Sequence, residues 1–121
     1  MTKQAVIWLH LPVWQFKAAL EQPLSDSEDI TECQLWVASE WLIHCAGPIF
    51  KEMSSKADLD ESDAGSFRTG PLCDAEPLSV ERWQFWRKRL SDLAAGVSAG
   101  VAGHVEEALR SMDAAEADVS L

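Results

Sequence analysis

The side chains of this sequence best suited to acid–base or nucleophilic chemistry are histidine and cysteine, and two of them are adjacent. His44 and Cys45 follow Glu40 in a segment that is otherwise short of polar groups. On a helix, Glu40 lies one turn before His44 and can orient its imidazole, so His44 is the candidate general acid or base. The competing interpretation is a core or half-buried histidine whose ring is hydrogen-bonded to a backbone carbonyl. We favour this interpretation because a single residue rarely marks a catalytic site. Cys45 would point about 100° away from His44 on a helix, which argues against a nucleophile–base pair.

Spacing of the ligand-type residues does not support a metal or a cofactor. The cysteines Cys33, Cys45 and Cys73 are far apart, whereas a structural zinc site needs four converging Cys or His ligands. The acidic stretch 58–76 lacks the alternating ligands and central glycine of a calcium loop. There is no glycine-rich phosphate loop and no dinucleotide or serine-elbow motif. We therefore expect no metal and no cofactor.

Large aromatic rings are the main apolar feature, with six tryptophans, four phenylalanines and no tyrosine. Pockets for apolar ligands are commonly lined by such rings together with a few polar groups. We expect a cleft in which Trp41, Trp83 and Trp86 contact an apolar small molecule, with Arg68, and also Arg82, as candidates for its polar end. The competing interpretation is that these rings form the core and that the arginines are surface charge.

Charge argues against two classes of partner. The formal net charge of -10, from 20 acidic and 10 basic residues, repels nucleic acid and anionic lipid. One basic cluster, Arg82, Arg87, Lys88 and Arg89, lies among aromatic residues, but we rank a nucleic-acid platform below a structural helix with a solvated face. No charge-free stretch reaches the roughly 20 residues of a membrane span. The odd cysteine count and the lack of a signal-peptide pattern predict a reduced, cytoplasmic setting.

Apolar periodicity predicts helices over most of the chain. The expected segments are 4–22 with a break or kink at Pro12, 28–46 with a kink at Gly47–Pro48, a third capped by Ser79, and 101–117. The residues expected to face inward are, in chain order, Ile7, Leu11, Trp14 and Ala18; Ile30, Cys33, Val37, Trp41, His44 and Cys45; Trp83, Trp86, Leu90, Leu93 and Val97; and Val101, Val105, Ala108, Met112 and Ala115. Arg82, Arg87 and Arg89 are expected to extend into water.

These segments predict an all-α fold, a single domain over 1–121 built as a small bundle of four or five helices. A long acidic, flexible loop is expected on the surface over 54–77, and a frayed tail over 118–121. Ten large rings are hard to bury in one small domain, so the alternative to small-molecule binding is a non-catalytic interaction module, most simply a homodimer.

Three blocks of the sequence together resemble a known family. They are Trp41-Leu42-Ile43-His44 with Phe50, then Phe67-Arg68-Thr69-Gly70-Pro71-Leu72, then Ser79 to Leu90, which contains an E-R-W-x-F-W-x-x-R pattern. Over roughly Cys33 to Ala117 they look like a family of fungal proteins of unknown function, whereas Met1 to Gln22 matches nothing in it. The resemblance implies a helical fold and a fungal source, and it carries no catalytic residue across. By analogy with other small fungal proteins, it suggests an isomerase, cyclase or accessory protein of specialised metabolism.

Overall fold

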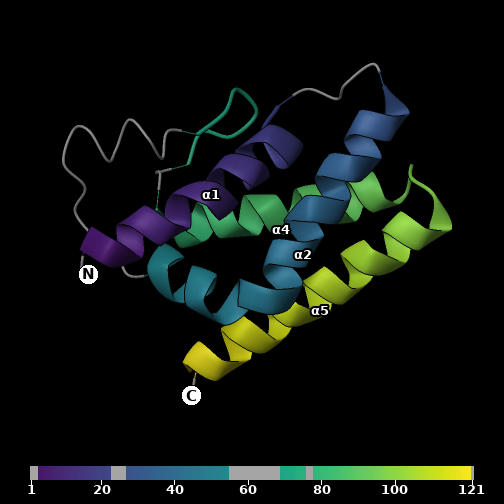
Figure 1. Cartoon of the computed structure of the whole chain (residues 1–121). Coiled ribbons are helices and arrows are strands. Elements are labelled where there is room, and N and C mark those ends of the chain that lie inside the picture. Colours follow the sequence, from purple (N-terminus) through teal and green to yellow (C-terminus); the bar gives the residue numbers. More distant parts are fainter. Residues whose placement is uncertain (1–2, 23–26, 55–68, 76–77, 121) are drawn as a thin grey trace.

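The structure, a computed structural model, describes residues 3–22, 27–54, 69–75 and 78–120. Within these ranges there are four helices and no strand, which confirms the all-α prediction (Figure 1). The helices are α1 (Lys3–Leu20), α2 (Glu28–Met53), α4 (Val80–Ala94) and α5 (Ala99–Ser120). Most of the predicted acidic loop over 54–77 lies outside the described residues. None of the described helices is long and apolar enough to cross a lipid bilayer.

Helix α1 runs through Pro12 as one helix, so a break at this position is wrong, and the kink given as its alternative stays a prediction. A proline removes one amide hydrogen from the ladder, and the bonds on either side of it can still form. The predicted inward face is also wrong, because the side chains of Leu11 and Trp14 are 59% and 66% exposed. Val13 and Phe16 point inward instead. This helix carries apolar residues on nearly all sides, so its periodicity does not define one inward face. Contacts with the rest of the bundle determine which side is buried.

Helix α2 begins after Ser27, whose side chain accepts a hydrogen bond from the amide of Ile30 at 3.4 Å. The helix changes direction at Cys45, where φ is -134° and ψ is 17°. Pro48 has no amide hydrogen to give to the carbonyl of His44, so the ladder opens at this point. This confirms the predicted kink beside Gly47–Pro48, and Figure 1 shows the two halves of α2 running in different directions.

The buried face of α2 differs from the prediction. Ile30, Cys33 and His44 are exposed, and Val37, Trp41 and Cys45 are only partly buried. The buried side chains of α2 are Leu35, Ala38, Ser39, Leu42, Ala46, Ile49, Phe50 and Met53. The reason is the same as in α1: a helix that is apolar nearly all round offers several possible stripes.

Helices α4 and α5 follow their predicted periodicity closely. Ser79 caps α4 by accepting a hydrogen bond from the amide of Arg82 at 3.1 Å. The buried side chains that had been expected to face inward are Trp83, Trp86, Leu90, Leu93, Val105, Ala108, Met112 and Ala115. Both helices have one clear apolar stripe and a polar remainder, so their periodicity selected the right face. Helix α5 continues to Ser120, beyond the predicted end at Ala117.

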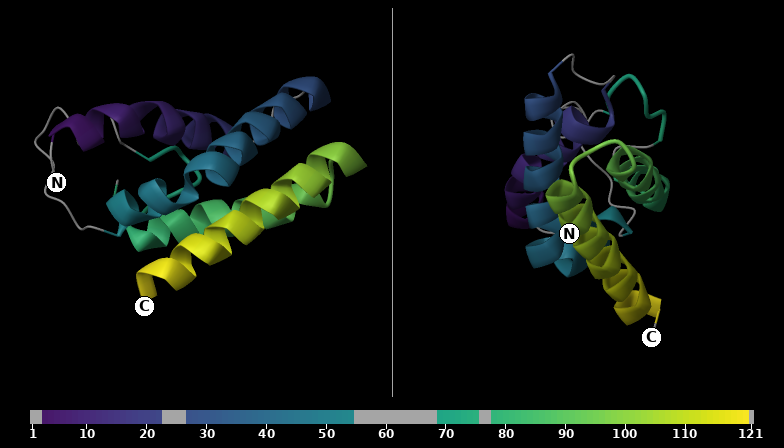
Figure 2. Two further views of the ribbon diagram at one scale, coloured as in Figure 1. Left: turned by 60° about the horizontal axis from the view of Figure 1, so that its bottom comes forward. Right: turned by 90° about the vertical axis from the view of Figure 1, so that its right-hand side faces the viewer.

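Helix α2 contacts each of the other three helices, while α1 and α5 lie on opposite sides of the bundle (Figure 2). Two pairs of aromatic rings, each tilted with respect to one another, join α4 to α1 and to α2. Phe16 of α1 packs on Trp86 of α4 with ring centroids 4.6 Å apart, and Phe50 of α2 packs on Trp83 at 4.8 Å. The kink in α2 sets the direction of the half that carries Phe50. Because one ring from α1 and one from α2 pack on them, the indole rings of Trp83 and Trp86 lie at the centre of the core.

Candidate functional site

The predicted catalytic histidine lies in water. The side chain of His44 is 70% exposed, so the expected buried imidazole is wrong. Its orientation by Glu40 is confirmed, because His44 Nε2 lies 3.0 Å from Glu40 Oε2. The other oxygen of Glu40 lies 2.9 Å from His104 Nε2 on α5, close enough for an ion pair but without hydrogen-bond alignment. The His104 ring stacks on Trp36 at 3.7 Å, so this cluster lies where α2 and α5 meet.

The predicted ligand-binding tryptophans lie in or against one hydrophobic core. Trp83 and Trp86 have no exposed surface, and Trp41 is half-buried against the same core. Arg68 lies outside the described residues. The rings of Trp83 and Trp86 therefore lie in the core, as the competing interpretation of these residues expects. A ligand-binding role for these four residues stays a prediction.

An ion pair between Glu21 and Arg82 is completely buried where α1 ends beside α4. Arg82 Nε donates to Glu21 Oε2 at 2.7 Å, and Nη2 donates to Oε1 at 2.9 Å. The indole nitrogen of Trp86 donates to Oε2 at 2.7 Å, and the amide of Gly70 donates to Oε1 at 2.8 Å. The carboxylate thus accepts four hydrogen bonds, as a buried charge must if its loss of hydration is to be offset.

The expectation that Arg82 extends into water is wrong. Its guanidinium lies over the ring of Trp86, 5.4 Å from the centroid. A sequence signal for this position existed, because Arg82 precedes Trp86 by four residues and so shares its helix face. No comparable signal marked Glu21, which is separated from Arg82 by 61 positions.

The same carboxylate fixes the segment 69–75 against the end of α1. Besides the Gly70 contact, the amide of Leu72 donates to the backbone carbonyl of Glu21 at 3.0 Å. The approach at Gly70 is so close that a Cβ atom there would lie 2.6 Å from the Glu21 carbonyl oxygen. Only glycine fits this position without a backbone shift. Cys73 is buried in the same segment, and burial raises the pKa of its thiol.

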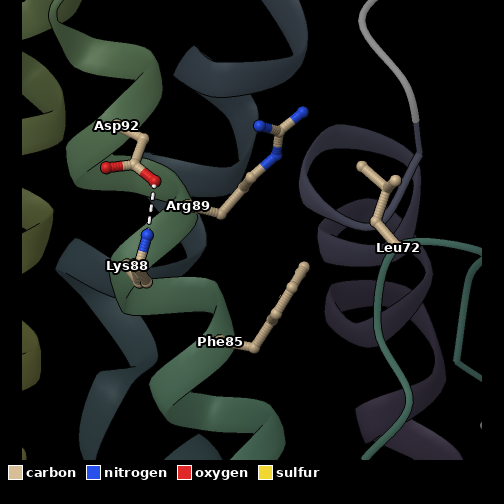
Figure 3. Close-up of a pocket in the computed structure, with 5 residues that line it drawn as sticks. All are labelled: Leu72, Phe85, Lys88, Arg89 and Asp92. Atoms are coloured by element: carbon tan, nitrogen blue, oxygen red, sulfur yellow. Dashed lines mark hydrogen bonds and ion pairs between the residues drawn. The ribbon is translucent and has the colours of Figure 1, made fainter.

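A cleft of about 230 Å³ opens between this segment and α4. It is lined by Leu72, Phe85, Lys88, Arg89 and Asp92 (Figure 3). In Figure 3, Leu72 approaches from the segment, and Phe85 and Arg89 approach from α4 on the opposite side. Leu72 is exposed and Phe85 is half-buried, so the cleft presents apolar surface to solvent. The sequence indicates Lys88 and Arg89 as part of a basic cluster among aromatic residues, but it does not predict a cleft at this position.

The basic residues of α4 differ in whether a carboxylate neutralises them. Arg82 pairs with Glu21, Arg87 pairs with Asp113 and Glu116 of α5, and Lys88 lies 3.0 Å from Asp92. Arg89 donates from Nε to the carbonyl of Leu20 at 3.3 Å. Among the described residues, no carboxylate lies within ion-pairing distance of Arg89. The cleft therefore contains one fixed cation without a counter-charge from the described part of the chain.

A family model described as a protein of unknown function (DUF3632) matches residues 2–90. The chain belongs to this family. No curated protein and no solved structure gives a significant match. The predicted membership of a family of unknown function is confirmed, whereas the expectation that Met1 to Gln22 matches nothing is wrong, because the DUF3632 match begins at residue 2.

The DUF3632 match contains both sides of the buried ion pair and most of the cleft. Glu21, Gly70 and Arg82 all fall within it, as do Leu72, Phe85, Lys88 and Arg89. The match ends before α5 begins. The group formed by Glu40, His44 and His104 is therefore divided. Glu40 and His44 lie inside the matched region, and His104 lies outside it.

The buried pair gives this DUF3632 protein a defined acid sensitivity. Burial by itself raises the pKa of Glu21, but hydrogen bonds and charge from Arg82, with the Gly70 amide and the Trp86 indole, outweigh it and hold the pKa below its ordinary value of 4.5. A carboxyl group whose pKa is lower in the folded state stabilises the fold above the unfolded-state pKa and loses that contribution as the pH falls through the folded-state pKa.

We therefore expect stability from this group to be complete above about pH 4.5 and to fall progressively below it. Urea unfolding followed by tryptophan fluorescence between pH 3 and 7 (roughly the carboxyl range) measures this dependence. Glu21→Gln removes the titrating group, so its unfolding free energy should depend less on pH in this range. A variant with the same pH slope as the parent would contradict the assignment.

Proposed function

We propose that the protein binds a small molecule with an apolar body in the cleft between α4 and the segment 69–75, without catalysing a reaction. The observation that carries this proposal is the pair of apolar side chains, Leu72 and Phe85, that face a concave opening of about 230 Å³. Ligand sites are typically concave, mostly apolar and supplied with a few placed polar groups. The cleft has these properties, with Arg89 and the Lys88–Asp92 pair at its polar end.

The wall of the cleft is already in place before any ligand arrives. The amides of Gly70 and Leu72 are bonded to Glu21, and the opposite wall is a turn of α4 that is anchored in the core by Trp86 and Leu90. A preformed site loses little conformational entropy on binding, which favours affinity. Binding therefore does not require the segment to fold around its ligand.

Binding without catalysis is favoured by the distribution of reactive groups. Among the described residues, the cleft lining includes no histidine or cysteine, and its lysine is paired with Asp92. His44 lies on α2 and takes part in the contact with α5. Relative to the sequence-based prediction, the apolar contact moves from Trp83 and Trp86, which are fully buried, to Phe85 and Leu72.

A panel of small apolar compounds titrated into ¹⁵N-labelled protein tests the proposal. We expect saturable amide shifts at Gly70, Leu72 and Cys73 and in residues 85–92 for some members of the panel. Phe85→Ala should weaken binding by about tenfold, because burial of an aromatic ring against a ligand contributes more than roughly 1.4 kcal/mol. Phe85→Leu, which keeps apolar surface, is the matched control and should lose less. A panel without saturable shifts, or an unchanged affinity of Phe85→Ala, would contradict the proposal.

A homodimer is the second candidate function, favoured by the exposed apolar side chains of α1. Leu11 and Trp14, three positions apart, share one face of that helix and are more than half exposed. A second copy that covers them would remove this apolar surface from water. Light scattering on a sizing column decides the question, since a strict monomer at high concentration would exclude it. A cytoplasmic setting and a role in fungal specialised metabolism stay predictions.

A further inference from the structure

We propose that the ligand of the cleft is a small monocarboxylic acid whose carboxylate is bound by Arg89; this inference rests on the proposed binding function. It goes further than that function because it assigns the chemical class of the ligand and the residue that selects it. The reasons are the hydrogen-bonded position of Arg89, the charges around it and the size of the cleft.

Arg89 is held in a geometry that suits a carboxylate. Its Nε is engaged by the carbonyl of Leu20 at 3.3 Å, which leaves the two terminal nitrogens of the guanidinium. These two nitrogens form the end of a planar fork that matches the two oxygens of a carboxylate. The bond to Leu20 restricts the guanidinium at the edge of the cleft, which reduces the side-chain entropy lost on binding. Figure 3 shows the Arg89 side chain extending from α4 into the space between this helix and Leu72.

The charges of the cleft favour a single negative charge on the ligand. Lys88 and Arg89 contribute two positive charges, and Asp92 contributes one negative charge. Lys88 is already neutralised by Asp92 at 3.0 Å, so the remaining charge among the described lining residues is that of Arg89. A carboxylate matches it, whereas a phosphate, with close to two negative charges at neutral pH, would bring excess charge near Asp92. The overall charge of -10 would repel a multiply charged anion further.

The size of the cleft limits the apolar body of the acid. Its volume of about 230 Å³ is below the roughly 300–1,000 Å³ of sites for drug-sized molecules. One aromatic ring or a short alkyl chain is therefore the expected body, placed between Phe85 and Leu72. Phenylacetate and hexanoate are suitable probes, and phenylacetamide is a neutral compound of nearly the same shape.

Titration of phenylacetate and phenylacetamide into ¹⁵N-labelled protein tests this assignment. We expect the acid to bind at least tenfold more tightly than the amide. Arg89→Gln should remove this preference and leave the affinity for the amide nearly unchanged. Arg89→Lys keeps the charge but not the fork, and should keep only part of the preference. Arg110→Gln is the matched control, because it removes one exposed positive charge of α5 and should leave the preference intact.

Each outcome supports or overturns the assignment. Equal affinity for acid and amide in the parent protein overturns it and leaves the proposed binding function standing. No binding of either compound, nor of hexanoate, overturns the assignment, and a whole panel of apolar compounds without saturable shifts overturns the binding function as well. Tighter binding of phenyl phosphate than of phenylacetate overturns the assignment to a monoanion. A preference that survives in a folded Arg89→Gln variant, as judged by circular dichroism, overturns the role of Arg89.

Discussion

Glu21→Gln is expected to lower the free energy of unfolding by about 3–5 kcal/mol, the cost of breaking a buried ion pair by removing one partner. The carboxylate is fully buried and accepts hydrogen bonds from Arg82, Trp86 and Gly70. Glutamine has nearly the same shape, but it leaves the guanidinium without a counter-charge and turns an NH₂ group toward other donors. Urea unfolding at neutral pH, followed by circular dichroism, measures the loss.

Two further variants test the contribution of the buried ion pair. One removes the other partner of the pair, and one removes an exposed ion pair on the same helix. Arg82→Met should also be strongly destabilising, but less so than Glu21→Gln, because the carboxylate keeps its hydrogen bonds from Trp86 and Gly70. Lys88→Met removes an exposed pair on the same helix and should change stability by less than about 1 kcal/mol. Similar small losses for Glu21→Gln and Lys88→Met would show that the buried pair is not a major determinant of stability.

Gly70→Ala is expected to lower the free energy of unfolding by about 1–3 kcal/mol, the usual cost of forcing an extra methyl group into a packed site. The added carbon would lie 2.6 Å from the carbonyl oxygen and 2.8 Å from Cβ of Glu21. One of these neighbours is backbone and cannot rotate away, so the segment 69–75 must shift. The shift would stretch the bonds from Gly70 and Leu72 to Glu21 and displace a wall of the cleft.

Gly103→Ala is the matched control for this prediction. Gly103 lies within α5, and a Cβ atom there would meet no atom within 4 Å. Alanine should therefore raise stability by about 0.5–1 kcal/mol through its better helix propensity. Thermal unfolding of both variants gives the comparison. A Gly70→Ala protein as stable as Gly103→Ala would mean that the segment can move away from α1 at little cost.

The helices could be predicted from the sequence where one apolar stripe dominates. Helix α4 has such a stripe, Trp83, Trp86 and Leu90, and its cap at Ser79 and its buried face agree with the structure. Helices α1 and α2 are apolar nearly all round, so Leu11 and His44 were placed on buried faces although both are exposed. Periodicity fixes the kind of element, and the choice of face depends on partners that are distant in the sequence.

The candidate site could not be predicted because it depends on distant pairs. Glu21 and Arg82 are 61 positions apart, and neither residue type suggests burial by itself. The cleft likewise joins Leu72, which lies outside any helix, to Phe85 in the interior of α4. Trp83 and Trp86 lie on the apolar stripe of α4, and this stripe faces the centre of the bundle, so both rings are buried. The smaller ring of Phe85, at the edge of the α4 stripe, is the one left beside an opening.

Helix α5 lies beyond the region that this chain shares with its family, yet it packs along α2 and α4. It buries Val105, Ala108 and Met112 in the common core and binds Arg87 through Asp113 and Glu116. None of these residues lines the cleft. Changes on the outer surface of this C-terminal helix should accordingly leave the proposed binding site intact, provided that its apolar face still shields α2 from water.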